Sequence, residues 1–176
     1  MENVSIKSMV IKYGLTIGLI FSLIAVLSMV TGMATTGNAF VGILMGLLQL
    51  GLMIAIIIIA FNKFKVQRAG YISLGECMQI GVGIMVIGGL IAAVFGLVYG
   101  KLIDPGYYDR IMEVQRQTME DRGMSDDQID KAMGFASIFK GPGIAFATTL
   151  LCYFLGGTIL SLIIGLVMRN EKPEFE

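Results

Sequence analysis

Residues 39–61 read AFVGILMGLLQLGLMIAIIIIAF, and no Asp, Glu, Lys or Arg interrupts them. A helix needs ~20 apolar residues to cross the hydrocarbon core of a bilayer, so this stretch is long enough to span a membrane. Three other uncharged, apolar runs of similar length occupy residues 13–34, 77–100 and 141–168. Together they predict membrane-spanning helices over residues 10–34, 39–61, 74–102 and 141–168. The chain is therefore predicted to be all-α, an integral membrane four-helix bundle in a single domain.

The composition supports a membrane protein and disfavours catalytic chemistry. Charged residues make up 15% of the chain, against ~25% in a typical soluble domain, and the mean hydropathy is +0.81. The chain contains no His, the side chain best suited to acid–base work near neutral pH. Its cysteines, Cys77 and Cys152, have no metal-ligand spacing. We therefore expect no catalytic residue, no metal site and no cofactor.

A charged segment, residues 104–140, separates the third and fourth predicted spans. It contains five Lys or Arg and eight Asp or Glu residues. Asp104 followed by Pro105 predicts the N-cap and first position of a helix. Gly123 suits the end of that helix, and Ser125 begins the Ser-Asp-Asp-Gln pattern of a capping box that starts another. The segment is predicted to be an extramembrane helical hairpin that either folds onto the bundle or lies at the membrane interface.

A further capping box is predicted at the start of the third span. Ser73 precedes Glu76 by three residues, the spacing at which each side chain can bond the backbone amide of the other. Glu76 is also the ionisable residue closest to the interior of a span. A gating or partner-contact role is therefore the alternative to capping.

Small residues recur at four-residue spacing along the predicted spans. Lipid tails are as apolar as leucine side chains, so membrane helices associate by close packing, which small residues permit. These stripes either pack inside the bundle or dock another protein, and we expect one neighbouring helix along the stripe of the third span. The stripes comprise Gly14, Gly18 and Ser22 in the first span, Gly42 and Gly46 in the second, Gly88, Ala92, Gly96 and Gly100 in the third, and Gly157, Ser161 and Gly165 in the fourth.

Gln49 is the one amide deep inside the second span. An unpaired amide in hydrocarbon is costly, so a hydrogen bond to a neighbouring helix is expected. A substrate-binding role is the alternative. The candidate partners are Thr148, Thr149, Tyr153 and Thr158.

The distribution of Lys and Arg predicts the orientation of the spans. One side of the predicted bundle holds Lys7, Lys12, Lys63, Lys65, Arg68, Arg169 and Lys172, and the other holds Lys101, Arg110, Arg116, Arg122, Lys131 and Lys140. The first group lies on short tails and one short loop, whereas acids dilute the second group. Both termini are therefore expected in the cytoplasm and the hairpin in the periplasm.

Four short motifs resemble a known family. They are KYGL at 12–15, GYISLGE at 70–76, IDP at 103–105 and GMSDDQI at 123–129. Their order and spacing are similar to those of the small membrane proteins of Bacteroidota grouped as domain of unknown function 4199, and the resemblance covers nearly the whole chain. Leu74 departs from the Phe typical of that position. The resemblance implies a bacterial inner-membrane protein and implies no activity or catalytic residue.

Two classes of function remain open at this point. The first is a non-enzymatic structural or accessory subunit that associates with copies of itself or with a larger membrane complex. The second is a small transporter or channel subunit with a pore formed by several copies. Under either class, the expected partners of the protein are the lipid bilayer and other membrane helices, from a second copy or a larger complex, and nucleic acid is not among them.

Overall fold

The computed structural model describes residues 5–139 and 141–171, and it confirms the all-α prediction. The elements follow the order α1 (Ile6–Val30), η1 (Met33–Thr35), α2 (Ala39–Gln67), α3 (Leu74–Val98), η2 (Tyr99–Ile103), α4 (Tyr107–Asp121), α5 (Asp126–Ile138) and α6 (Pro142–Met168). Within the described residues, four helical stretches are long and apolar enough to cross a membrane: Ile6–Val30, Ala39–Gln67, Leu74–Ile103 and Gly143–Met168. The chain is therefore compatible with a multi-pass membrane protein.

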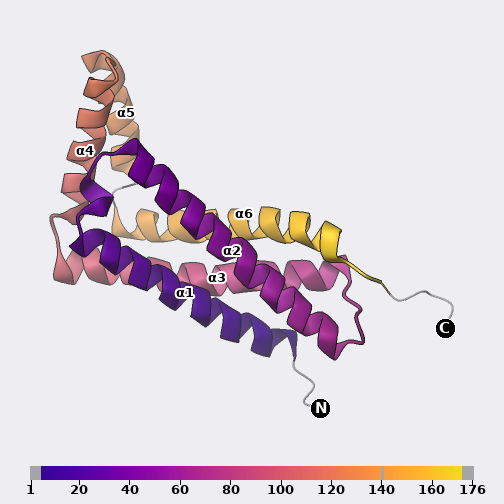
Figure 1. Cartoon of the computed structure of the whole chain (residues 1–176). Helices are drawn as coiled ribbons and strands as arrows, with labels where there is room; N and C mark the ends of the chain where they lie inside the picture. Colours follow the sequence, from indigo (N-terminus) through magenta and orange to yellow (C-terminus); the bar gives the residue numbers. More distant parts are fainter. Residues whose placement is uncertain (1–4, 140, 172–176) are drawn as a thin grey trace.

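Helix α3 lies at the centre of the bundle, with α1 packed along one side and α6 along another (Figure 1). Helices α1 and α3 run in the same direction, and α6 runs against them. The start of α1 and the end of α6 lie at one end of the bundle, which we call the terminal end. The hairpin of α4 and α5 lies at the opposite end, called the hairpin end.

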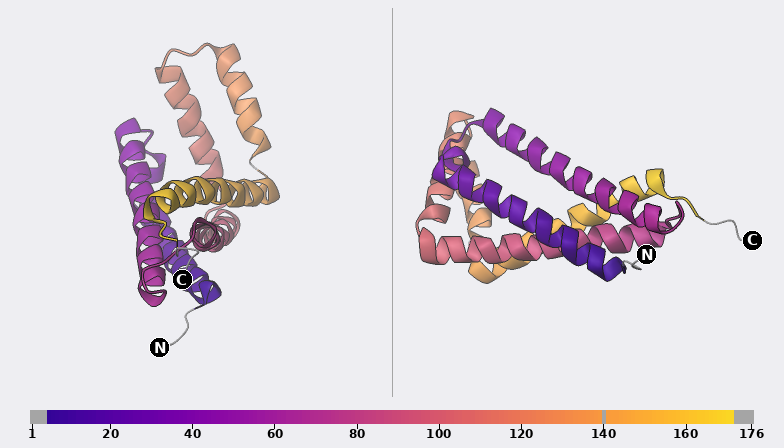
Figure 2. Two further views of the ribbon diagram at one scale, coloured as in Figure 1. Left: turned by 90° about the vertical axis from the view of Figure 1, so that its right-hand side faces the viewer. Right: turned by 60° about the horizontal axis from the view of Figure 1, so that its bottom comes forward.

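Helix α2 contacts the bundle mainly through its C-terminal half. Ile57, Ala60, Phe61 and Phe64 are buried there, in a core that also contains residues of α1, α3 and α6. Towards the hairpin end, α2 diverges from α3 and α6 (Figures 1 and 2), and its residues 39–51 are mostly exposed. The hydrophobic core is therefore concentrated near the terminal end.

Several helix bounds differ from the predicted spans. Helix α1 ends at Val30, because Gly32 adopts a left-handed conformation with φ of 72° that stops the helix. Helix α2 continues past residue 61 to Gln67, since Phe64 is buried in the core while Lys63 stays exposed. Residue 140, the last of the predicted hairpin, lies outside the described residues.

The hairpin does not lie along the spans, although α4 packs against the turn between α1 and α2, where Val114 and Thr118 lie close to Gly37. Helices α4 and α5 lie side by side, joined through Gly123 with φ of 73°, and Ile129 of α5 is buried. The pair projects sideways from the ends of α3 and α6, across the direction of the spans (Figures 1 and 2). If the spans cross a bilayer, the hairpin therefore runs along its surface.

Candidate functional site

Helices α3 and α6 interlock through pairs that join a small residue to a larger neighbour. A Cβ added at Gly157 would lie 2.6 Å from the Cβ of Met85, and one at Gly89 would lie 2.6 Å from the Cβ of Tyr153. Both distances are too short for real side chains, so each glycine lets the facing residue approach the helix backbone. Four pairs form this seam: Cys77 with Gly165, Gly81 with Ser161, Met85 with Gly157, and Gly89 with Tyr153.

Helices α1 and α3, which run parallel, also pack through glycines that face larger side chains of the neighbouring helix. A Cβ at Gly14 would lie 2.6 Å from the Cβ of Ile87, and one at Gly18 would lie 2.8 Å from the Cβ of Ile91. The two pairs have the same sequence offset, as expected for parallel helices in register. Glycines of α1 therefore receive isoleucines of α3, and the close packing extends over both sides of the central helix.

The four-residue stripe of α3 does not meet one neighbouring helix, so that expectation is wrong. Gly88 faces Ile17 of α1, whose Cγ2 would lie 2.7 Å from an added Cβ, whereas Gly96 and Gly100 face Tyr108 of α4. Ala92 lines a small cavity with Gly96 and Tyr108. In a helix of 3.6 residues per turn, a four-residue step rotates about 40° around the axis. The two ends of the stripe therefore point towards different elements.

Three tyrosines hold the base of the hairpin against the end of α3. The hydroxyl of Tyr108 donates a hydrogen bond to the carbonyl oxygen of Gly96, 3.2 Å away. The ring of Tyr107 packs edge-on against Tyr99 and Tyr108, with centroid distances of 5.4 and 5.6 Å. Burial raises the pKa of the Tyr107 phenol. Sequence reasoning missed this cluster, because no local pattern pairs Tyr108 with glycines on another helix.

Asp104 is not the N-cap of α4, contrary to the sequence prediction. Helix α4 begins at Tyr107 with Gly106 as its N-cap and no capping side chain. The carbonyl oxygen of Asp104 accepts the amide of Tyr107 at 3.1 Å, so a turn containing Pro105 precedes the helix. The Asp104 carboxylate instead pairs with Arg110. The π-helical segment η2 ends at Ile103, which places Asp104 at its C-terminus rather than at the start of α4.

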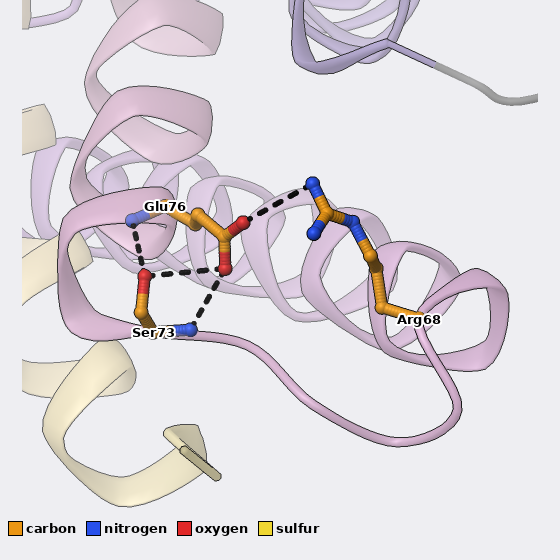
Figure 3. Close-up of polar contacts among 3 residues, drawn as sticks. All are labelled: Arg68, Ser73 and Glu76. Atoms are coloured by element: carbon orange, nitrogen blue, oxygen red, sulfur yellow. Dashed lines mark hydrogen bonds and ion pairs between the residues drawn. The ribbon is translucent and has the colours of Figure 1, made fainter. Parts of the chain in front are cut away.

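The capping box at Ser73 forms as its spacing predicts (Figure 3). The backbone amide and hydroxyl of Ser73 donate to Oε2 of Glu76 at 2.9 and 3.1 Å. The amide of Glu76 donates to Oγ of Ser73 at 3.2 Å. Arg68 approaches Oε1 of Glu76 at 3.4 Å, so both carboxylate oxygens contact residues beside the start of α3. The contacts of Glu76 support capping rather than gating.

The loop between α2 and α3 is also tied to the end of α6. The backbone of Ile72 and that of Asn170 exchange two hydrogen bonds of 2.8 and 2.9 Å in an isolated antiparallel bridge. The Lys65 ammonium donates to the carbonyl oxygen of Met168 at 3.0 Å and caps the C-terminal end of α6. Neither Lys65 nor Asn170 was a candidate from the sequence, because each bonds a partner about a hundred residues away.

The remaining predicted cap lies within the hairpin. Ser125 is the N-cap of α5, and its backbone amide donates to Oε1 of Gln128 at 3.1 Å, as part of a capping box. The Gln128 side chain thereby satisfies the Ser125 amide, which has no acceptor within the helix.

Gln49 does not make the expected interhelical hydrogen bond within the described chain. Its side chain is exposed on the diverging half of α2. Two of its candidate partners bond their own helix instead: Thr149 donates to the carbonyl oxygen of Ala145 at 2.9 Å, and Thr158 donates to that of Phe154 at 2.8 Å. The divergence of α2 leaves the amide without a neighbour.

The comparison with known families gives one match. A family described as a protein of unknown function, DUF4199, matches residues 12–170. The chain belongs to this family. No curated protein and no solved structure matches the chain.

The matched region of the DUF4199 family includes every packing and capping residue described above. Within the described residues, no group of three or more Cys, Asp or Glu side chains is placed to hold a metal ion. The features that stand out are contacts between helices, and the exposed N-terminal half of α2 makes few of them.

Proposed function

We propose that this DUF4199 protein is a non-enzymatic membrane subunit that acts by helix–helix association, and that a second copy of the chain is its partner. The observation that carries this proposal is that one face of α2, which we call the α2 seam, packs against the other helices only in its C-terminal half. Met53, Ile57, Ala60 and Phe64 follow one another at helical spacing and pack into the core. The association would complete the same seam in its N-terminal half.

Gly42, Gly46 and Gln49 continue that seam at spacings of four, three and four residues up to Met53. A Cβ added at Gly42 or Gly46 would meet nothing within 4 Å. Every other glycine stripe in the spans receives a side chain from a neighbouring helix, as at Gly14 and Gly18. Gly42 lines a cavity with Ile111 and Val114 of α4. Around Gly46 and Gln49, this half of the seam has the composition of a packed interface and lacks a helix that packs on it.

The depth of Gln49 adds an energetic argument. At 1.5 Å per residue, Gln49 lies ~15 Å from the start of α2, near the middle of a ~30 Å hydrocarbon core. An amide left unpaired there is costly, which favours association with a partner that can hydrogen bond to it. A two-fold axis along the membrane normal would bring two Gln49 side chains to the same depth. Each amide could then donate to the other and accept from it.

The association can be tested with substitutions that the isolated chain accommodates. Gly46→Leu and Gln49→Leu should keep the protein folded, because neither position has a close neighbour. Both should weaken the dimer. Gly46→Leu would keep the two helices apart, and Gln49→Leu would remove an interhelical hydrogen bond, which costs about 1 kcal/mol in a membrane, or several-fold in affinity. Mass measurement in mild detergent would detect the change for both, and disulfide trapping of Gly46→Cys in a Cys152→Ser background, with and without Gln49→Leu, would detect it for Gln49→Leu.

Gly51→Leu is the matched control. Gly51 is exposed, has nothing within 4 Å of an added Cβ, and lies on the opposite side of α2 from Gly42. Gly51→Leu should leave the dimer intact. A monomeric wild type in membranes, or a dimer equally insensitive to all three substitutions, would overturn the proposal.

The transporter or channel class has weaker support. It requires polar side chains along a shared path, and the hydroxyls of Thr149 and Thr158 are bonded to their own helix. Tyr153 packs against Gly89 in the seam between α3 and α6.

The same proposal includes an orientation in a bacterial inner membrane, with both termini cytoplasmic and the hairpin periplasmic. The basic side chains at the terminal end support it, since Lys63, Lys65 and Arg68 cluster at the C-terminal end of α2. Lys140 and Lys172, which belong to the predicted charge distribution, lie outside the described residues.

A further inference from the structure

The last two turns of α5 are apolar and exposed, although they lie outside the spans. Residues 132–139 read AMGFASIF and contain no charged side chain, whereas Asp126, Asp127, Asp130 and Lys131 occupy the preceding turns. The exposed fractions are 66% for Phe135, 56% for Ile138 and 40% for Phe139. The rings of Phe135 and Phe139 pack together, with centroids 5.3 Å apart.

This apolar group lies close in the chain to the candidate span of α6. Helix α5 leads through Gly141 into α6, whose first turn exposes Ile144. At the other base of the hairpin, Leu102 and Ile103 at the end of the α3 span are also exposed. The apolar part of α5 therefore adjoins the point where the chain enters the membrane, and the charged part of α5 is distant from it.

The direction of the hairpin places this group at the bilayer surface. The hairpin runs across the spans (Figures 1 and 2), and the contact of Tyr108 with Gly96 and Gly100 holds its base in that direction. A polar interfacial layer several ångströms thick borders the hydrocarbon core on each side, and aromatic and aliphatic side chains of surface helices are buried there.

We propose that the C-terminal half of α5 is a lipid-contact surface, with Phe135, Ile138 and Phe139 inserted into the boundary between headgroups and acyl chains of the leaflet at the hairpin end. The hairpin is then an interfacial amphipathic element, not a domain free in water. The partner is the lipid itself. The hairpin contains more acidic than basic residues, so the contact depends on apolar burial and not on attraction to anionic headgroups.

The absence of tryptophan from the chain gives a direct test. Phe139→Trp and, separately, Phe135→Trp each create a single tryptophan in the full-length protein, reconstituted in phosphatidylcholine vesicles and excited at a wavelength that the six tyrosines do not absorb. Bromine atoms placed near the headgroup end of the acyl chains should quench both, by at least about twofold more than they quench Gln117→Trp on the polar surface of α4. Leu151→Trp, exposed on the α6 span, is the positive control.

Two results would overturn the proposal. In the first, aqueous acrylamide quenches Phe135→Trp and Phe139→Trp as strongly as Gln117→Trp while brominated lipid does not. In the second, lipid quenching appears only when the protein is diluted in lipid, which would identify a second copy as the occupant. Adding the anionic lipid phosphatidylglycerol to the vesicles should leave the quenching unchanged, because the proposed contact does not depend on headgroup charge. The result is independent of the α2 seam, so this proposal and the proposed association can fail separately.

Discussion

Single glycines decide how closely the spans approach one another. Gly81 is the tightest position, since an added Cβ would collide with Ser161 of α6. Ser161 is fully buried, and its hydroxyl finds no hydrogen-bond partner among the described residues. A buried hydroxyl without a partner is unfavourable, so the small volume of serine, rather than its polarity, suits this position.

Gly81→Ala should therefore destabilise the bundle. Overpacking a well-packed interface typically costs about 1–3 kcal/mol, which exceeds the helix-propensity gain of about 1 kcal/mol from replacing glycine by alanine. Unfolding in detergent by a denaturing surfactant would measure the loss. Gly75→Ala on the same helix is the control, because an added Cβ there meets nothing within 4 Å.

A second substitution distinguishes this collision from a general effect of the mutation. Ser161→Gly removes the colliding Cβ and hydroxyl, so it should restore part of the stability lost in Gly81→Ala. If the double variant is no more stable than Gly81→Ala, the contact between Gly81 and Ser161 is not the cause.

Helices α4 and α5 depend on different start signals, although both were expected to begin with a capping side chain. Ser125 caps α5, whereas α4 starts at Gly106 without such a cap and is held by its contacts with α3. Local signals therefore account for the start of α5, and tertiary contacts of Tyr107 and Tyr108 account for the start of α4.

Ser125→Ala should loosen the first turn of α5 and leave the spans unchanged. Loss of an N-cap hydroxyl typically costs ~1 kcal/mol, which corresponds to roughly fivefold faster amide exchange where exchange requires opening of that turn. Hydrogen exchange over residues 126–132 would measure it. Ser137→Ala, in the last turn of the same helix, should not change exchange in that region. Equal protection in wild type and Ser125→Ala would contradict the assigned cap.

The molecule as a whole has two different ends. At the terminal end, the bridge between Ile72 and Asn170 and the bond from Lys65 to Met168 tie α2, α3 and α6 together. At the hairpin end, α2 diverges and the hairpin extends sideways (Figure 1). The proposed association and the proposed lipid contact both lie towards the hairpin end, while most of the buried core and these interhelical bonds lie towards the terminal end.

A topology experiment tests the four-span arrangement. A periplasm-active phosphatase fused at Asp121 should be active, and a cytoplasm-active fluorescent protein at the C-terminus should fluoresce, because an odd number of spans separates the two sites. A fusion at Gly37, in the turn between α1 and α2, should behave like the one at Asp121. Reporters at Asp121 and at the C-terminus on the same side of the membrane would contradict the four-span arrangement.

The sequence by itself determined the helical class, the spans and most breaks between them. Uncharged stretches of sufficient length define the spans, and local residues such as Gly123 and Ser73 end or begin helices through bonds that reach only a few positions along the chain. These features need no knowledge of distant residues, which is why the all-α membrane fold and the capping box at Ser73 could be predicted.

Only the tertiary structure decided which face of each span meets which neighbour. A span that is apolar all round carries no polar face to indicate its buried side, so the pairing depends on steric fit between residues far apart, as for Gly89 and Tyr153. The same reason explains why Gln49 is left exposed and why Asp104 pairs with Arg110 instead of capping α4. The path of α2 away from the bundle and the turn of η2 set those positions, and neither is encoded in a local pattern.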